Sequence, residues 1–171
     1  PMSRTIESHR EYAQRWASTW ERQAAVRARP IGEGELADRA RELFAELAYG
    51  GVSESDVRDI RLLKARMENE RLPRGTEPAR HVKLGPGGLS DVEWTIQLIQ
   101  MRTGIRNPAL RTPSTTQAIL AARDHDLMSA EDAQILLQAW DMATRIRAAN
   151  TLATGRMSGV KLDVLPRDSA R

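Results

Sequence analysis

Apolar residues recur every three or four positions along most of the chain, and this spacing restricts the possible folds more than any other feature. One such run consists of Leu36, Ala40, Leu43, Phe44 and Leu47. Residues three and four apart share one face of an α-helix, whereas a half-buried β-strand requires alternation of apolar and polar residues. No alternating stretch of strand length occurs in the sequence. The sequence therefore predicts an all-α fold, an antiparallel bundle of about six helices.

The first predicted helix starts at Ser8, because Ser8 and Glu11 have the spacing of a capping box. Its apolar face carries an aromatic residue at every fourth position, and Pro30 ends the run. Aromatic residues in such a stripe are expected to pack against a neighbouring helix. All four tryptophans are therefore predicted to be core residues, namely Trp16, Trp20, Trp94 and Trp140.

Two further helices are predicted before a segment that is rich in helix breakers. The second helix is expected to end at Gly50-Gly51. The third begins where Ser53 precedes Asp56 by three residues, and its apolar face ends before Pro73. Proline and glycine are concentrated in residues 73–88, which excludes a helix there. Only the part from His81 to Leu84 is compatible with a short extended piece.

The clearest helix start in the sequence reads Leu89-Ser90-Asp91-Val92-Glu93-Trp94. Ser90 is expected at the N-cap with Glu93 bonding back to it, while Leu89 and Trp94 have the spacing of a hydrophobic staple. Replacing Trp94 with alanine is then expected to cost about 3–5 kcal/mol. Apolar residues surround most of this helix, so we expect it near the middle of the bundle, ending by Gly104.

The last two predicted helices complete the bundle. One begins at Thr112-Pro113, with a capping threonine and a proline in the first turn. The other begins at Ser129 and runs to about Leu152. Beyond it the periodic pattern ends. We therefore expect a helical bundle domain over residues 1–155 and a polar tail over residues 156–171 that leads into a missing downstream segment.

The charge pattern and composition exclude several classes of protein. The chain has 26 basic and 23 acidic residues, a net charge of +3, and no cysteine. Without cysteine, disulfides and zinc–thiolate sites are excluded. Most of the basic residues are arginines, which suit phosphates, but acidic residues alternate with them, which argues against a nucleic-acid-binding stripe. The apolar runs are too short to span a membrane and no signal segment precedes them, so we expect a cytoplasmic protein.

No residue is predicted to be catalytic or to bind a metal. The three histidines, His9, His81 and His125, are isolated from other metal ligands and are expected at the surface or at helix caps. No serine lies in the context of a nucleophile. The turn from Gly85 to Gly88 precedes a helix N-terminus, where free N–H groups favour an anion. Phosphate binding there is one interpretation, and a purely structural turn is the favoured one.

Residues 83–94 carry a resemblance to a known family. They read Lys83-Leu84-Gly85-Pro86-Gly87-Gly88-Leu89-Ser90-Asp91-Val92-Glu93-Trp94, followed by Gln97 and Gln100. This segment resembles the motif K-x-G-x-G-G-[LI]-x-D-[IV]-E-[FW] of bifunctional glutamine synthetase adenylyltransferase/adenylyl-removing enzymes. Upstream, Trp20-Glu21-Arg22-Gln23-Ala24 resembles the segment that follows their nucleotidyltransferase domain. Further matches at residues 60–68 and 110–115 occur in the same order, and the resemblance covers roughly residues 8–150.

The resemblance implies a helical domain that packs beside a nucleotidyltransferase domain. In that family the catalytic domain binds ATP and Mg²⁺, and the parent enzyme transfers AMP to a tyrosine of glutamine synthetase, or removes it, under control of a PII signal protein. No cofactor is expected in this chain, and Asp91 and Glu93 are not expected to be metal ligands. The segment 70–75 is more similar to the carboxy-terminal, adenylylating half of actinobacterial members.

Within this resemblance, three cations are candidates for contact with nucleotide phosphates or with the catalytic domain: Lys83, Arg61 and Arg66. For Arg66 an ordinary surface ion pair is the alternative. A structural role is expected for the motif residues Gly85, Gly87, Gly88, Ser90, Asp91, Glu93, Trp94 and Gln97. Two other functions remain open, a non-catalytic basic module that binds nucleic acid and a protein-interaction scaffold.

Overall fold

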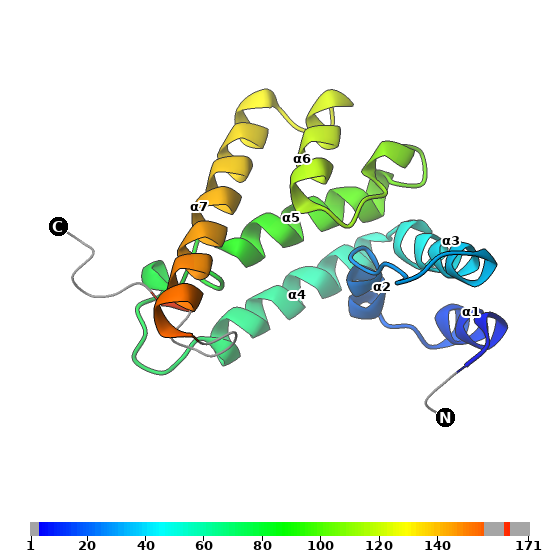
Figure 1. Ribbon diagram of the computed structural model, residues 1–171, viewed down its shortest axis with the longest axis horizontal. Coiled ribbons are helices and arrows are strands. Elements are labelled where there is room, and N and C mark those ends of the chain that lie inside the picture. Colours follow the sequence, from blue (N-terminus) through cyan, green and yellow to red (C-terminus); the bar gives the residue numbers. More distant parts are fainter. Residues whose placement is uncertain (1–3, 156–162, 165–171) are drawn as a thin grey trace.

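The computed structural model describes residues 4–155 and 163–164, and these form seven α-helices and two short 3₁₀ helices with one isolated β-bridge (Figure 1). The elements in chain order are α1 (Ile6–Arg15), α2 (Thr19–Ala25), α3 (Glu35–Tyr49), α4 (Glu54–Arg71), η1 (Pro78–Arg80), α5 (Leu89–Thr103), η2 (Pro108–Leu110), α6 (Thr115–Asp124) and α7 (Ala130–Thr154). The predicted all-α bundle is confirmed. It has one helix more than the six expected because the first predicted helix is two helices.

The first predicted helix is interrupted after Arg15. Thr5, not Ser8, is the N-cap of α1, and its hydroxyl accepts a hydrogen bond from the Ser8 N–H at 3.2 Å. The Glu21 carboxylate accepts a hydrogen bond from the Ser18 N–H at 2.8 Å, which starts α2. Because this second cap satisfies backbone groups at a new helix start, the chain turns there instead of continuing as one helix.

The prediction that all four tryptophans lie in the core is wrong for two of them. Trp16 and Trp20 are 67% and 56% exposed. The break between α1 and α2 changes the direction of the helix axis, so the four-residue stripe does not form one continuous buried face. Trp94 and Trp140 are half-buried and each packs against a hydrophobic cluster. Leu36, which belongs to the periodic apolar run that predicts α3, is also largely exposed.

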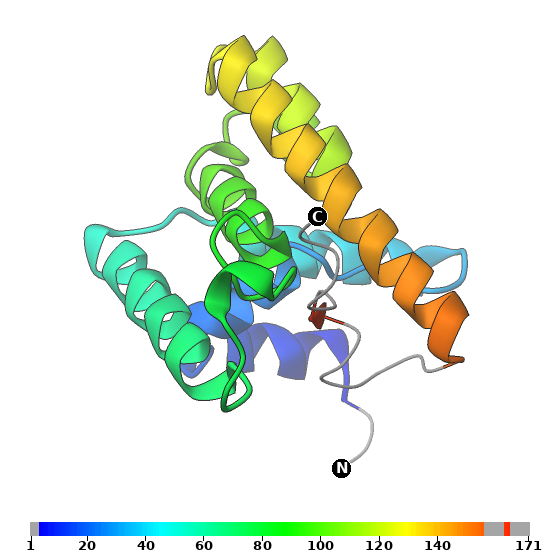
Figure 2. The same cartoon turned by 90° about the vertical axis from the view of Figure 1, so that its left-hand side faces the viewer.

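Two hydrophobic clusters hold the helices together, and α5 contributes to both. The first, which we call the C-terminal core, consists of Val92, Ile96, Leu110, Ala118, Ile119, Ala122 and Ala133. The second, the N-terminal core, consists of Ala25, Val26, Ala48, Tyr49, Ile60 and Met101. Helix α5 lies between α6 and α7 on one side and α2 and α3 on the other (Figures 1 and 2). The predicted central position of α5 is therefore confirmed.

The two last helices start at serine caps. Ser129 caps α7 as predicted, since its hydroxyl accepts the Asp132 N–H at 3.0 Å. The predicted start of α6 at Thr112-Pro113 is wrong, because Ser114 is its N-cap. The Thr112 hydroxyl instead accepts the Ser114 N–H at 3.2 Å. The 3₁₀ turn η2 comes just before this segment and moves the helix start toward the C-terminus.

Residues 163–164 return to the glycine-rich segment. Val164 forms an antiparallel bridge with His81, and the Val82 N–H donates to the Asp163 carbonyl at 2.8 Å. The Asp163 carboxylate pairs with Arg147 of α7 at 2.5 Å. His81, expected at the surface or at a cap, is buried. The rest of the predicted polar tail, at residues 156–162 and 165–171, lies outside the described residues.

Candidate site at the glycine turn and the groove beside it

Three glycines of the motif are required by the backbone geometry before α5. A Cβ at Gly85 would lie 2.1 Å from the Pro78 carbonyl oxygen, and one at Gly88 would lie 2.7 Å from the Val82 carbonyl oxygen. Gly87 has a φ of +71°, in the left-handed region that favours glycine. The turn is thus folded closely against residues 78–83, and any side chain at Gly85 or Gly88 would displace backbone.

The backbone N–H groups at the start of α5 already have acceptors. The Leu89 N–H donates to the Val82 carbonyl and the Ser90 N–H to the Lys83 carbonyl, each at 2.9 Å. Gly88, not Ser90, is the N-cap, and Asp91 accepts the Gly87 N–H at 2.7 Å. The predicted capping box is therefore wrong, because the preceding turn supplies the acceptors and α5 starts two residues earlier. With the N-cap at Gly88, Leu89 and Trp94 no longer hold the two positions of the predicted staple. With its donors engaged, this helix end offers little to an anion.

The two carboxylates of the motif are neutralised by cations from other segments. Lys64 of α4 pairs with Asp91 at 2.5 Å. Burial lowers the pKa of Lys64, but its hydrogen bonds to Asp91 and Glu68 outweigh burial and raise this pKa. Glu93 accepts a hydrogen bond from Arg27 at 3.0 Å, and the same nitrogen of Arg27 donates to the Thr115 hydroxyl at 2.7 Å. Asp91 and Glu93 thus tie α5 to its neighbours.

This arrangement does not fit a magnesium site. Magnesium is held by carboxylates that converge on one point. Asp91 and Glu93 are two residues apart on a helix and each already has its own cation. Within residues 4–155 and 163–164, no group of three or more histidine, aspartate or glutamate side chains could hold a metal ion.

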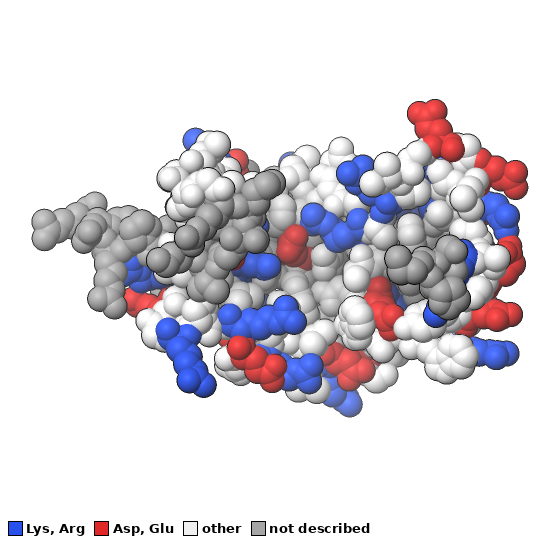
Figure 3. Space-filling model, turned by 60° about the horizontal axis from the view of Figure 1, so that its bottom comes forward, with Lys and Arg blue, Asp and Glu red and all other residues white. Residues whose placement is uncertain are grey.

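The three cations singled out in the sequence are not gathered at one place. Lys83 lies exposed on the turn, and Arg61 and Arg66 lie exposed on α4. Arg66 pairs loosely with Glu70, at 3.8 Å. Arg66 also lines a groove between α2, α4 and α5, whereas Lys83 and Arg61 do not. On the face shown in Figure 3, basic and acidic side chains are interspersed, as the sequence predicts.

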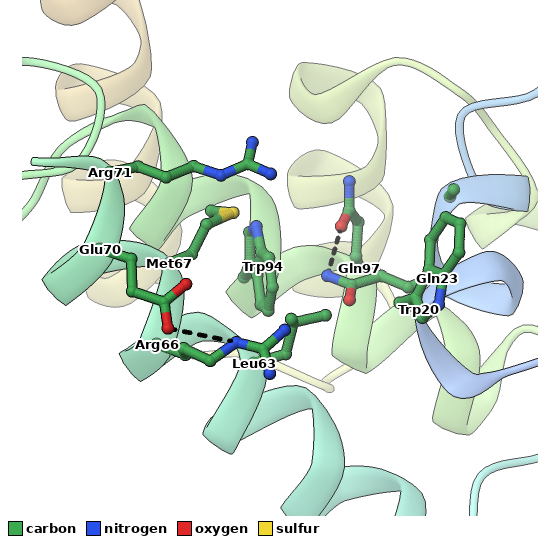
Figure 4. A pocket seen from close by; sticks show the side chains of 10 residues that line it. Trp20, Gln23, Leu63, Arg66, Met67, Glu70, Arg71, Trp94 and Gln97 are labelled. Atoms are coloured by element: carbon green, nitrogen blue, oxygen red, sulfur yellow. Dashed lines mark hydrogen bonds and ion pairs between the residues drawn. The ribbon is translucent and has the colours of Figure 1, made fainter.

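The groove has a volume of about 490 Å³ and combines indole rings, amides and arginines (Figure 4). Its lining residues are Trp20, Gln23 and Ala24 of α2, Leu63, Arg66, Met67, Glu70 and Arg71 of α4, and Trp94 and Gln97 of α5. Sequence reasoning selected only Arg66, Trp94 and Gln97 as site residues. Trp20 and Gln23 belong to a motif segment that the sequence analysis noted, but nothing local placed this segment beside α5.

A buried amide pair closes one side of the groove. The Gln23 Nε2 donates to Gln97 Oε1 at 2.9 Å, and both side chains are more than nine-tenths buried. Because the two residues are 74 positions apart, this bond also fixes α2 against α5. Gln100, on the same helix, is committed elsewhere, since its Nε2 donates to the Leu110 and Thr112 carbonyls at 2.6 and 2.8 Å.

Comparison with known proteins gives consistent matches along the chain. A family model described as GlnD PII-uridylyltransferase matches residues 61–168, and one described as glutamate-ammonia ligase adenylyltransferase matches residues 1–44. The chain is 50% identical, over 98% of its length, to a bifunctional glutamine synthetase adenylyltransferase/adenylyl-removing enzyme of Streptomyces coelicolor. Relatives with the same name from Leifsonia xyli and Mycobacterium tuberculosis are 46% and 45% identical over 98% and 91% of the chain.

The match covers only a small part of each relative. The chain spans 17% of the Streptomyces coelicolor protein and 16% of the Leifsonia xyli protein. Among the described residues, none of the helices has the length and apolar character needed to cross a membrane.

Proposed function

Because the chain belongs to the family whose model is described as GlnD PII-uridylyltransferase, and its relatives are glutamine synthetase adenylyltransferases, we propose that it is a helical domain of such an enzyme. The observation that carries this proposal is the 50% identity over 98% of the chain. Identity at this level along the whole chain supports the same fold and the same place in a larger polypeptide.

In this proposal the domain supports catalysis without performing it. ATP and Mg²⁺ are bound by a nucleotidyltransferase domain elsewhere in the parent polypeptide, which acts in the cytoplasm. The ion pairs of Asp91 and Glu93 support this division, because both carboxylates already serve to hold α5. The parent enzyme transfers AMP to glutamine synthetase or removes it, with a PII protein as regulator, and we assign the domain to the adenylylating half.

The exposed cations have a specific role in the proposal. Lys83 and Arg61 are exposed and have no partner among the residues that the structure describes. The tightly folded glycine turn holds the Lys83 backbone in place, since the Lys83 carbonyl accepts the Ser90 N–H. A cation on a rigid segment contacts an acidic partner at a low entropic cost. We therefore assign Lys83 and Arg61 to the contact with the catalytic domain.

A domain exchange tests this function. The chain would replace the matching segment of the Streptomyces coelicolor relative, and transfer of AMP from ATP to glutamine synthetase would be measured with radiolabelled ATP. We expect the chimera to keep activity within about tenfold of the parent. A folded chimera without adenylylating and adenylyl-removing activity would contradict the proposal.

Point variants of the chimera test the assigned contact. Lys83→Gln and Arg61→Gln are each expected to lower the transfer rate by about two- to tenfold, because each removes a charge at the domain contact. Arg145→Gln on α7 is the control, since Arg145 is also exposed, lies far along the chain from the turn and has only a loose ion pair with Asp141, at 3.6 Å. Equal effects of all three substitutions would remove the assignment of Lys83 and Arg61.

Nucleic-acid binding is the alternative function, and a gel shift of the chain separates it from this proposal. A basic module would form a complex whose affinity falls steeply with salt. A domain of an adenylyltransferase is expected to give no shift at low or moderate salt.

A further inference from the structure

A separate hollow of about 330 Å³ lies between the C-terminal end of α2, the helix α3 and the loop that precedes α6. It is lined by three cations, Arg29, Arg41 and Arg111, together with apolar residues. Among the residues that the structure describes, no aspartate or glutamate lines it. We call it the Arg111 hollow. A concave site lined by cations and by no acid attracts an anionic group.

The side chain of Arg111 is held in one position. Its Nε donates to the Gly104 carbonyl at 2.8 Å, and its Nη2 donates to the Ile105 carbonyl at 3.0 Å. Its guanidinium also lies over the buried Tyr49 ring, 5.9 Å from the ring centroid. Because these contacts already order the side chain, an anion that binds to Arg111 costs little further side-chain entropy.

One edge of the Arg111 guanidinium is free. A guanidinium is a planar fork with N–H donors along two edges. The two carbonyls take the donors of the Nε–Nη2 edge, and Nη1 has no hydrogen-bond partner among the described residues. The Nη1–Nη2 edge therefore presents two parallel N–H groups, which match the two oxygens of a carboxylate. Arg111 is exposed, so a partner can reach this edge.

The other charges place the positive potential on one side of Arg111. Arg29 is exposed and has no partner among the described residues, whereas Arg41 is partly neutralised by Asp38. A neighbouring hollow shares Arg111 and is lined by Glu42 and Glu46, of which Glu46 pairs with Arg10 at 3.0 Å. The Arg111 hollow thus carries a net positive charge, and the acidic groups line its neighbour.

Apolar side chains flank the free edge of Arg111. Pro30, the half-buried Phe44 and the exposed Pro113 line the hollow. On the side of the neighbouring hollow, Ile105 is 54% exposed. A small inorganic anion gains nothing from such walls, whereas the apolar neighbours of an acidic residue in a peptide would cover them. The lining therefore favours a peptide segment that carries a carboxylate beside an apolar side chain.

The small size of the hollow favours a segment of the same polypeptide over a separate protein. Stable contacts between separate proteins bury about 1,200 Å² or more in total, which a hollow of this size does not supply by itself. A tethered segment needs much less affinity, because its effective concentration is in the millimolar range. The chain spans 17% of the Streptomyces coelicolor relative, so most of that polypeptide lies outside the matching part.

We propose that the Arg111 hollow binds an acidic segment from another part of the parent polypeptide, with a carboxylate on the free edge of Arg111 and an apolar side chain against Phe44 and Pro113. This inference rests on the proposed function, in which the chain is one domain of a larger enzyme. In Figure 1, α3 lies toward the opposite end of the molecule from the segment that links α4 to α5 and carries Lys83. The hollow is thus a second contact, separate from that of Lys83.

Nuclear magnetic resonance of the purified chain with isotope-labelled tyrosine rings tests the site. The chain has two tyrosines, Tyr12 on α1 and Tyr49 next to Arg111. Overlapping peptides that cover the rest of the Streptomyces coelicolor relative are each added to about 1 mM. At least one acidic peptide is expected to shift the signals of Tyr49 and not those of Tyr12. Its form with amides in place of carboxylates is expected to have no effect. No shift with any peptide, or equal shifts with the amide form, would overturn the proposal.

Charge-removing variants test the assigned contacts. Arg111→Gln is expected to weaken binding of the peptide about tenfold or more, and circular dichroism would confirm that it folds. Arg29→Gln removes no hydrogen bond among the described residues and is expected to weaken binding about threefold. Arg106→Gln is the control, because Arg106 is exposed near Arg111 in the sequence but lines neither hollow. Equal weakening by Arg29→Gln and Arg106→Gln would overturn the proposal.

Other probes and the chimera separate the possible sources of the carboxylate. Inorganic phosphate at the same concentration is expected to leave the Tyr49 signals unchanged, and an effect equal to that of the peptide would overturn the choice of a peptide segment. Binding only by peptides of glutamine synthetase would overturn the choice of the parent polypeptide. In the chimera, a photoreactive residue in place of Ile105 is expected to cross-link to another part of the same polypeptide. An active chimera without this cross-link would reject the inference and leave the proposed function intact.

Discussion

The two hydrophobic cores on either side of α5 are built differently. The C-terminal core consists of aliphatic residues that are at most 1% exposed, and three of them are alanines. The N-terminal core contains Tyr49 and Met101, and next to it lie the Gln23–Gln97 pair and the groove. Small residues allow α6 and α7 to approach α5 closely, so that side is sealed. Long polar and aromatic side chains between α2, α4 and α5 leave an open groove.

The two cores therefore differ in the interactions that stabilise them. The seven buried residues of the C-terminal core include no titratable group. The N-terminal core depends on ion pairs and hydrogen bonds, such as that between Arg22 and Asp56. The stability of the two sides is therefore expected to respond differently to truncation and to pH.

The largest effect is expected from Ile119→Ala in the C-terminal core. Ile119 is fully buried, and its truncation leaves a cavity that the sealed packing cannot fill, at a cost of about 3–4 kcal/mol. Ile135→Ala on α7 is the control, because Ile135 is 55% exposed. Urea denaturation measures the free energy of unfolding of both variants. Similar midpoints for Ile119→Ala and Ile135→Ala would contradict the view that Ile119 lies in a closely packed core and Ile135 on a solvated face.

A smaller loss is expected from Trp94→Ala beside the groove. The sequence predicted that Trp94 belongs to a hydrophobic staple, and that Trp94→Ala lowers the free energy of unfolding by about 3–5 kcal/mol. Trp94 is only half-buried and faces the groove, so we expect about 2 kcal/mol. Trp16→Ala, at an exposed position, is expected to cost less than about 1 kcal/mol. If Trp94→Ala destabilised the chain as much as Ile119→Ala, the N-terminal side would be as closed as the other.

Asp56 is expected to make the N-terminal side sensitive to acid. Burial raises the pKa of Asp56, but the Ser53 N–H and hydroxyl, the Thr19 hydroxyl and Arg22 together lower it to about 2, from 3.8. The folded state therefore favours the ionised form of Asp56. The ionised carboxylate contributes about 2 kcal/mol to the free energy of unfolding, and this contribution is fully present above pH 3.8. It is lost as the pH falls toward 2.

The measurement compares the pH dependence of unfolding in the wild type and in Asp56→Asn. The variant should be about 1–2 kcal/mol less stable at neutral pH and should lack this part of the acid-induced loss. If the free energies of unfolding of the wild type and of Asp56→Asn fell in parallel between pH 4 and 2, Asp56 would not be the cause of the acid-induced loss of stability.

The smallest effect is expected at His81. Burial is the largest cause and lowers the pKa of His81 below its usual value. Asp163 and a backbone hydrogen bond raise this pKa, and Lys83 and Arg147 lower it by smaller amounts. Its Nδ1 accepts the Leu84 N–H at 3.0 Å, which requires the neutral ring. In the unfolded chain His81 takes up a proton near pH 6.5. The contribution of the neutral His81 ring to the free energy of unfolding is therefore fully present above pH 6.5 and decreases as the pH falls below it. The melting temperature of His81→Asn, which keeps an acceptor, should change less between pH 7 and 5.5 than that of the wild type.

Much of the fold was predictable from local patterns. The capping pairs Ser53–Asp56 and Ser129–Asp132 fix the starts of α4 and α7 within one helical turn, and both predictions are confirmed. The central position of α5 followed from its apolar residues on all sides. The predictions failed where two local signals compete, as at Ser8 and Ser18, or where a preceding turn supplies the cap, as at Gly88.

The groove could not be predicted in the same way. Gln23 and Gln97 are 74 residues apart, and each alone is an unremarkable polar residue of a helix. Their meeting depends on how α2 lies across α5, which in turn depends on the break after Arg15 and on the packing of Tyr49 and Met101. No pattern within a single helix carries that information.

The amino-acid sequence by itself determined that the chain is helical, where α4 and α7 start, and which turn is rich in glycine. Periodicity, capping and backbone freedom act within a few residues, so the sequence specifies them directly. Only the tertiary structure decided that Trp16 and Trp20 remain exposed, that His81 is buried beside Val164, and that a groove opens beside Trp94. Burial depends on which distant helices face each other, and that is a property of the assembled bundle.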